Sequence, residues 1–550
     1  MSLPLFKTWT FGTSPTPPLT KPKQSFHHGV ATCAAIVSIS ALSVLSAPLQ
    51  AEVLKWGANR DIGSLDPYSY GDSFTINVLN HVYEGLVRYD KDLKIEPALA
   101  ESWEILDDQI TWRFKLRPEV TFHNGNAFTA EDVVASLERV SHETSPLKGN
   151  LPAYVSSAVV DDMTVDITLN GTYPLLLNDL TNIHIFDKGW LIENDSELPT
   201  DIGSGTEGYA TYNANGTGPF IVESRQPDAK TVFLVNPDWW DTPQHNLTRI
   251  ELLPVSSPAT RVAALLSGEI NFTNDAPVQD LPRLEAAPTV NVLEGVDLRT
   301  VMIGMSFRDK LNNGTDNPFS ELKVRQALYQ AIDVDQLQQK VMRGKSRTAG
   351  AVIAPPIPGY VPELDERLPY DPKVAQGLLA EASVPEGLEF DFNCLQDGLV
   401  NEEQFCQAIA SMWSRIGLNP KLDVAPRAVQ TPKRTNGQTD VYTLGWATLP
   451  MLDAYSPLLQ IFHTKEGNSG VFNWGDWSFP ELDALVQAAG KELDLEKRLA
   501  LETEALQIVK DEIIMIPLHQ QPMAWAVTDE VVEMPLFPDN KPRLWFATVK

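Results

Sequence analysis

The sequence has 550 residues, of which 43% are hydrophobic and 21% are charged, and both fractions are ordinary for a globular chain. Its length predicts more than one domain, or one domain with large insertions. The formal net charge of −29 disfavours a nucleic-acid partner, because phosphates would be repelled and no cluster of Lys and Arg offsets the acidity.

The first 51 residues have the layout of a secretory signal peptide. They contain three lysines and no Asp or Glu, and an apolar run extends from Val30 to Leu45. The small residues after this run predict cleavage between Ala51 and Glu52. The run is shorter than a membrane span requires, so we expect an exported and soluble mature protein in the periplasm.

The stretch 103–140 predicts a hairpin followed by a capped helix. Apolar and polar residues alternate over 110–116, which is typical of a strand with one buried face, and Asp107 and Asp108 form a turn before it. Thr129 is a natural N-cap, and Asp132 lies three residues later at the capping-box position. The stretch 159–169 predicts a second hairpin of the same kind.

The second half of the chain predicts alternating strands and helices. The segments 389–394, 402–416 and 419–424 read as strand, helix and strand, a spacing that suits a parallel crossover. A further strand is predicted at 440–446. Ser320 is a good N-cap for a helix with apolar residues at the 3.6 period. This order of elements indicates an α/β fold.

Three blocks of the chain carry a resemblance to a known family. The block AESWEILDDQITWRFKLRPEVTFHNGNAFTAEDVVASLERV (100–140) resembles the signature of the family 5 extracellular solute-binding proteins, the periplasmic receptors of ABC importers for peptides, nickel complexes and related solutes. GTGPF (216–220) and PFSELKVRQALYQAID (318–333) are similar to further blocks of that family, in the same order. We interpret the signature block as structural rather than as part of a ligand site.

The resemblance implies an α/β, two-lobe periplasmic binding protein fold (type II, cluster C-like) with an extra inserted subdomain. The domains that it implies are a signal peptide at 1–51, a first lobe at 52–88, 216–298 and 520–550, an inserted subdomain at 89–215, and a second lobe at 299–519. The implied function is capture of a peptide or similar small solute between closing lobes and delivery to an inner-membrane ABC permease with its ATPase. We expect a monomer without a cofactor.

The resemblance also implies where the ligand binds. Trp446 matches a glycine–tryptophan pair of the family's peptide receptors, and Asp453 is the nearest match to the aspartate that pairs with a peptide's α-ammonium; the alternative is that Asp453 caps the next helix. The turn after Cys394 lacks the expected base, and Arg427 is a substitute for it. Ser306, in a strand at the lobe junction, is a further candidate. These features lean toward a cationic or amine-bearing ligand.

Aromatic residues of the first lobe are candidates for the wall of the cleft. The resemblance implies that the opening strand and its loop reach the cleft, which makes candidates of Tyr68, Tyr70 and Tyr83. Each is equally well read as a core or rim aromatic.

Two cysteines remain in the mature chain. Cys394 and Cys406 lie twelve residues apart and predict a disulfide in an oxidising compartment, with two buried thiols as the alternative. The isolated His463 and His519 border segments near the implied cleft, so a receptor for a nickel or other metal chelate is the second reading, although no histidine pair has the spacing of metal ligands.

The sequence contains no motif typical of an enzyme. It has no nucleophile elbow, no HExxH, no Walker A and no dinucleotide fingerprint. The third reading, a secreted hydrolase, lacks a nucleophile and base pair, so we predict that the chain is not an enzyme and has no catalytic residues.

Overall fold

A mixed sheet of eleven strands runs through the part of the chain that the computed structural model describes, which comprises residues 52–202, 205–396 and 398–550. The predicted signal peptide at 1–51 lies outside the described residues. The order of the strands is β15-β14-β16-β12-β17-β11-β1-β10-β9-β8, and β13 pairs with β17. The bounds are β1 (Val53–Ala58), β8 (Phe220–Gln226), β9 (Lys230–Val235), β10 (Arg249–Pro254), β11 (Phe272–Thr273), β12 (Val290–Met305), β13 (Arg347–Thr348), β14 (Glu389–Leu395), β15 (Asn419–Ala425), β16 (Val441–Trp446) and β17 (Met515–Thr528).

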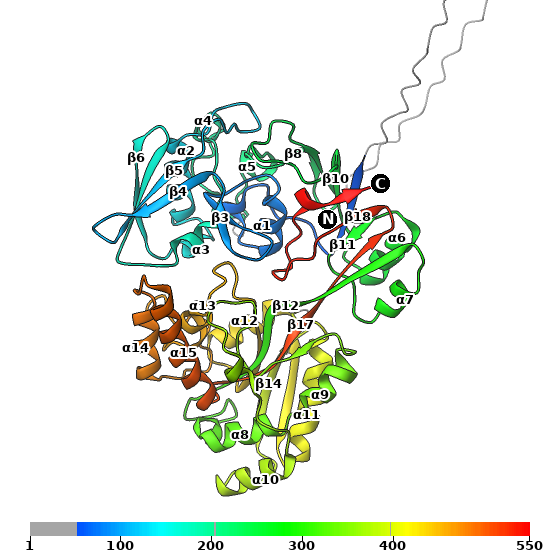
Figure 1. The fold of residues 1–550 in the computed structure, drawn as a ribbon. Helices are drawn as coiled ribbons and strands as arrows, with labels where there is room; N and C mark the ends of the chain where they lie inside the picture. The colour runs from blue at the N-terminus through cyan, green and yellow to red at the C-terminus, as the bar shows by residue number, and fades with distance from the viewer. Residues whose placement is uncertain (1–51, 203–204, 397) are drawn as a thin grey trace, which may run out of the picture. The chain divides into compact units, whose positions relative to one another are not determined.

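The chain has the predicted α/β, two-lobe fold (Figure 1). We call the part that contains β1, β8–β11 and α1–α7 the first lobe, and the part that contains β13–β16 and α8–α15 the second lobe. Strands β12 and β17 belong to both lobes. They pair from Val290 opposite Thr528 to Gly304 opposite Met515, and the register shifts between Val296 and Thr300. The predicted lobe boundaries at 298/299 and 519/520 therefore fall inside these two strands.

A four-stranded antiparallel sheet forms the core of the segment that the sequence predicts as an insertion. Its order is β4-β5-β7-β6, and Arg113 on β5 donates two hydrogen bonds of 2.8 Å to Asp166 on β7. Both predicted hairpins are present. The strands are β4 (Ala100–Ile105), β5 (Thr111–Leu116), β6 (Tyr154–Asp161) and β7 (Thr164–Leu169), and short pairs are formed by β2 (Val87–Tyr89) with β3 (Ile95–Pro97) and by β18 (Val531–Glu533) with β19 (Thr548–Val549).

Local capping explains where two predicted helices begin. Asp132 accepts hydrogen bonds from the backbone N–H and the hydroxyl of Thr129, at 2.7 and 2.9 Å, which confirms the predicted capping box of α2. The predicted N-cap at Ser320 is wrong, because Asn317 accepts the N–H of Phe319 at 2.9 Å and starts a tight turn that includes Ser320. Helix α8 therefore begins after Glu321.

Helices surround the sheets of both lobes (Figure 1). In the first lobe they are α1 (Ser73–Leu79), α2 (Ala130–Ser141), α3 (Leu176–Leu180), α4 (Lys188–Glu193), α5 (Tyr209–Tyr212), α6 (Pro258–Ser267) and α7 (Leu281–Glu285). In the second lobe they are α8 (Leu322–Gln330), α9 (Val334–Gln336), α10 (Pro372–Glu381), α11 (Glu402–Arg415), α12 (Arg427–Thr435), α13 (Tyr455–Pro457), α14 (Pro480–Ala489) and α15 (Leu495–Asp511). None of the helices described is both long enough and apolar enough to cross a bilayer.

The predicted strand–helix–strand unit is present in the second lobe as β14, α11 and β15, with β14 and β15 parallel. Cys394 on β14 and Cys406 on α11 are joined by a disulfide and are both fully buried. The apolar core around them includes Phe392, Phe405 and Trp413. The bridge therefore fastens this helix to the sheet from inside the core of the lobe.

Candidate functional site

A cavity of about 310 Å³ lies between the two lobes. Its first-lobe wall is built by the start of α1, the loop 146–150, and two residues far along the chain, Asn182 and Lys541. Its second-lobe wall is Leu449 and Pro450. Cavities of about 70 and 200 Å³ are each lined from a single lobe, and a cavity of about 240 Å³ beside the β12–β17 pair has walls at Glu294 and Lys345. We use the name interlobe cavity for the space of about 310 Å³, which borders the loop after Trp446 and the residue after Tyr70. The interlobe cavity is the candidate site, because a space with walls from both lobes changes when the lobes move.

The loop that closes this cavity from the second lobe is held by the first lobe. The hydroxyl of Tyr89 lies 3.1 Å from the carbonyl oxygens of both Pro450 and Met451. Asn178 donates through its side-chain amide to the Met451 carbonyl at 2.5 Å. These side chains come from β2 and α3, so the inserted subdomain takes part in the contact between the lobes.

Trp446 lies at the end of β16, opposite Thr300 of β12. Its indole N–H donates to the Ser456 hydroxyl at 3.3 Å, and its ring meets Phe472 edge to face at 5.0 Å. Arg299 donates to the carbonyl of Gly445 at 3.1 Å. A base therefore lies beside the glycine–tryptophan pair, and sequence reasoning missed it because only the strand register brings the two segments together.

Asp453 already has partners. It is buried, Arg498 on α15 donates to Oδ2 at 3.1 Å, and Oδ1 accepts the N–H of Tyr455, the first residue of α13, at 3.0 Å. The second contact lies directly before α13, but the N-cap of that helix is Ala454 and has no side-chain cap bond, so the helix-capping alternative stays a prediction. Both carboxylate oxygens are thus engaged, which argues against the predicted role of Asp453 as the partner of a ligand ammonium.

A second acidic side chain, Glu502, lies beside Asp453. Glu502, one turn after Arg498 on α15, is fully buried, and its Oε1 lies 3.4 Å from Arg498 Nε. Burial and the neighbouring Asp453 carboxylate raise the pKa of Glu502 to about 9. One arginine is therefore shared between two acids, and Glu502 is protonated at neutral pH.

The three tyrosines divide into core and surface residues. Tyr68 is fully buried, and its hydroxyl donates to the His184 carbonyl at 2.5 Å, while Tyr83 is buried and donates to the Leu65 carbonyl at 3.2 Å. Both have the core role that was the alternative for each. Tyr70 is 37% exposed, and its neighbour Gly71 lines the interlobe cavity. Of the three, Tyr70 alone keeps a place near the cleft.

Ser306 directly follows β12, at the end of this strand that lies far from Trp446. Thr300 is opposite Trp446, and Met305 is opposite Val441 at the far end of β16. Ser306 is fully buried there, and its backbone N–H donates to the Asp440 carbonyl at 2.7 Å. The register therefore separates Ser306 from Trp446 by the length of β16, which argues against its predicted contact with ligand.

Arg427 is the first residue of α12 and is exposed. It does not line the interlobe cavity among the residues described. Its positive charge contributes to lowering the pKa of Arg434, after burial of that residue, which is the larger cause. The structure thus places Arg427 on the second lobe near Arg434, and the role of substitute base remains a prediction.

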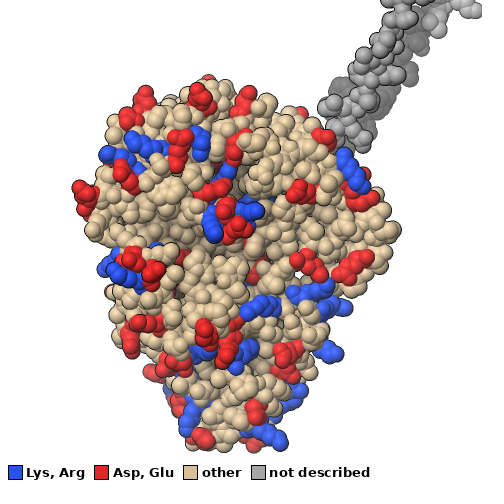
Figure 2. Space-filling view, viewed as in Figure 1, with Lys and Arg blue, Asp and Glu red and all other residues tan. Residues whose placement is uncertain are grey.

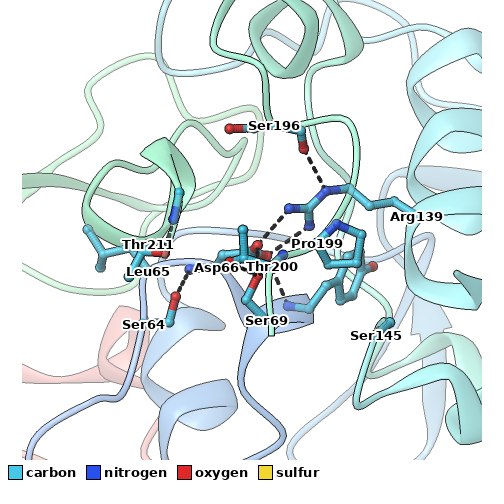
Figure 3. A network of polar contacts seen from close by, with 12 residues as sticks. Ser64, Leu65, Asp66, Ser69, Arg139, Ser145, Ser196, Pro199, Thr200 and Thr211 are labelled. Carbon is cyan, nitrogen blue, oxygen red and sulfur yellow. Dashed lines mark hydrogen bonds and ion pairs between the residues drawn. The ribbon is translucent and has the colours of Figure 1, made fainter. Parts of the chain in front are cut away.

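The signature block fastens the inserted subdomain to the loop after β1. Arg139 on α2 donates to both oxygens of Asp66, at 2.8 and 2.6 Å, and also donates to the Ser196 carbonyl at 3.0 Å (Figure 3). Both ionised side chains are buried. Burial raises the pKa of Asp66, but Arg139 outweighs that effect and holds the pKa below 3.8. These contacts agree with the structural interpretation of the block.

Among the described residues, one group of three side chains has the mutual distances of metal ligands: Cys394, Glu402 and Cys406. The two sulfurs form the disulfide. Glu402 Oε1 accepts the N–H of Leu395 at 2.7 Å and the hydroxyl of Thr443. These contacts give the group a structural role.

The two histidines that the sequence singled out are buried in the second lobe. His463 Nδ1 lies 2.6 Å from the Thr464 carbonyl and 3.6 Å from Asp483. His519 packs edge to face on Phe405 at 5.8 Å, and burial lowers its pKa to about 3. Neither lines the interlobe cavity.

Comparisons with known proteins all point to one family, the family 5 solute-binding proteins. Residues 94–469 match the family model described as the middle part of the bacterial extracellular solute-binding proteins, family 5. Heme-binding protein A of Haemophilus influenzae is 30% identical over 80% of this chain and 81% of its own. The glutathione-binding protein GsiB of Salmonella paratyphi A is 28% identical over 94% of this chain and 97% of its own.

A solved structure has the same fold. NikA from Brucella suis, crystallised in complex with Fe(III)-EDTA, superposes with a TM-score of 0.79 over 90% of this chain and 100% of its own, at 21% identity.

Proposed function

The chain belongs to the bacterial extracellular solute-binding proteins of family 5, and from that premise we propose that it captures a peptide or a similar small solute between its lobes and delivers it to an inner-membrane ABC permease. The family consists of binding receptors, so the chain is not an enzyme. The proposal places the mature protein in the periplasm as a monomer.

The interlobe cavity is the observation that carries this proposal. Its volume of about 310 Å³ lies at the lower end of the range of small-ligand sites, which is roughly 300–1,000 Å³. Its lining combines apolar side chains with a few polar ones, the composition that such sites require. Segments near residues 73, 147, 182, 450 and 541 meet there, so the site exists only when both lobes are folded and close together.

The mechanism needs no bond-making. Strands β12 and β17 connect the lobes, and the contacts of Tyr89 and Asn178 with the loop 449–452 fasten the lobes on the side of the inserted subdomain. A solute that fills the cavity adds contacts to both walls, and it therefore stabilises the form in which the lobes are close. That form is the one that we propose docks on the permease.

A receptor for a metal chelate is the second candidate. The complex of NikA with Fe(III)-EDTA on the same fold and the name of the heme-binding relative favour it. In such a case the chelator and not the protein would supply most metal ligands, so the absence of paired histidines in the sequence is no objection.

A thermal-shift screen of the mature chain, from residue 52, tests the two candidates against each other. Pools of di- to pentapeptides form one arm, and Ni(II)–histidine and Fe(III)–EDTA form the other. A peptide pool that raises the midpoint of unfolding supports the proposal, because a ligand that binds only the folded state stabilises it by mass action. If the chelates alone raise the midpoint, the ligand is a metal chelate and not a peptide, and the proposed role as a receptor still holds.

A further inference from the structure

The lining of the interlobe cavity has one charged side chain, and it is basic. Lys541 lines the cavity together with the neutral side chains of Ser73, Asn77, Asn150 and Asn182, and no Asp or Glu is among the described lining residues. The chain as a whole carries a net charge of −29, and acidic and basic side chains are interspersed over the face shown in Figure 2. The positive sign of the cavity is therefore a local property.

Lys541 lacks a counter-charge of its own. Asp539, two residues away, is buried, and its two oxygens accept from Arg543 at 3.3 and 2.8 Å. Lys541 itself makes no ion pair within 4 Å with any residue that the structure describes. Arg543 thus engages both oxygens of Asp539, and Lys541 lines the interlobe cavity as well as the cavity of about 70 Å³ beside Asp539.

The surroundings of Lys541 favour an incoming anion. Burial lowers the pKa of Lys541, while the neighbouring Asp539 raises it. His184 is buried nearby, and burial together with the charge of Lys541 lowers its pKa to about 3, so it is neutral and adds no second positive charge. A buried charge without a partner costs free energy, and a ligand that brings the opposite charge removes that cost.

We propose that the solute held in this cavity carries a carboxylate group that pairs with Lys541. This inference rests on the proposed function and names the chemical class of its ligand. One ammonium among neutral amides and a hydroxyl matches one monovalent anion, and the amides of Asn77 and Asn150 add hydrogen-bond donors. The apolar wall at Leu449 and Pro450 suits an aliphatic part of the same molecule.

This class is the opposite of the cationic ligand toward which the sequence leaned. That expectation depended on the acidity of the chain, on the missing base after Cys394 and on Asp453, whose charge is taken up by Arg498 at 3.1 Å inside the second lobe. The carboxylate that was expected to attract an ammonium is thus paired, and the ammonium of Lys541 is not.

A comparison of free and amidated peptides tests the inference. A tripeptide library with free C-termini, the same library amidated, and hexanoate as a simple monocarboxylate are each titrated against the wild type by native mass spectrometry. The same titrations are made with Lys541→Met, Lys541→Arg and the matched control Lys491→Met, which removes an exposed lysine elsewhere in the chain. We expect the free acids to bind at least tenfold more tightly than the amides, and Lys541→Met alone to abolish that difference.

Each outcome separates the inference from the proposed function. Equal binding of acids and amides, or a preference that survives in Lys541→Met, overturns the carboxylate inference and leaves a peptide receptor. Binding of hexanoate but of neither library, lost in Lys541→Met, overturns the peptide proposal and supports the inference. Failure of all three probes overturns both. A circular-dichroism melt shows whether Lys541→Met is folded. Lys541→Arg keeps the positive charge, so the inference requires that it retain the preference for free acids.

Discussion

Replacing Glu502 with Gln should make the protein more stable, and increasingly so as the pH rises. Glu502 is fully buried beside Asp453, and Arg498 is the one cation within 4 Å of either carboxylate among the described residues. Tyr455 and Asp179 lie in the same region, and neither side chain adds a positive charge to it. Gln has nearly the shape of the protonated acid and cannot ionise.

The magnitude follows from the pKa. The pKa of Glu502 is raised from 4.5 to about 9 in the folded protein. The folded state therefore holds a proton that the unfolded state releases above pH 4.5. The contribution of Glu502 to stability is thus fully present below that pH and is lost as the pH rises toward 9. The slope is about 1.4 kcal/mol for each pH unit. Between pH 5 and pH 8 the wild type should lose on the order of 4 kcal/mol from this group alone.

Urea unfolding at pH 5, 6, 7 and 8 measures this effect in the two proteins. The difference in the free energy of unfolding between Glu502→Gln and the wild type should grow by about 4 kcal/mol from pH 5 to pH 8. Asp529→Asn, an exposed carboxylate far along the chain, is the control and should show no such growth. A difference that stays constant across the four pH values would refute the reasoning, because Glu502 would then be ionised in the folded state.

Three further changes test other contacts. Asp66→Ala leaves Arg139 buried without a counter-charge and should lower the free energy of unfolding by about 3–5 kcal/mol in urea; a loss below about 1 kcal/mol would contradict the assigned pairing. Replacing Cys394 and Cys406 with Ser opens a link between residues twelve apart and should cost about 3 kcal/mol; an unchanged midpoint would contradict the bridge. Tyr89→Phe should speed amide hydrogen exchange in the loop 449–454, since the hydroxyl contacts are lost; unchanged exchange would show that they do not hold the loop.

Local signals in the sequence predicted local structure well. The hairpin around Asp107 and Asp108 and the capping box of Thr129 depend on residues within a few positions of one another, and the structure contains both. The error at Ser320 has the same origin, because Asn317, three residues earlier, starts a competing turn. The family blocks supplied the two-lobe architecture, which no local signal contains.

The candidate site was predicted less well, because long-range contacts decide it. Asp453, in the loop before α13, is paired by Arg498, which is 45 residues away on α15. The register of β12 on β16 places Arg299 beside Gly445 and carries Ser306 to the other end.

Lys541 reaches the cavity from near the end of the chain and meets residues around 73, 150 and 182. No periodicity or spacing in the sequence signals that meeting. A sequence-based search for basic residues in the last thirty positions would have found Lys541 only together with Lys550 and Arg543, without saying which one lines a cavity.

The most direct test of the account is native mass spectrometry of the mature protein, purified without denaturation, beside a variant whose cavity is filled. Asn150→Trp places a large ring in the interlobe space, and Asn436→Trp, at an exposed position at the end of α12, is the matched control. The account predicts that the wild type and Asn436→Trp carry a small solute that denaturation releases, and that Asn150→Trp is folded but empty. A folded Asn150→Trp protein that carries the same solute as the wild type would contradict it, because the solute would then bind outside the space between the lobes.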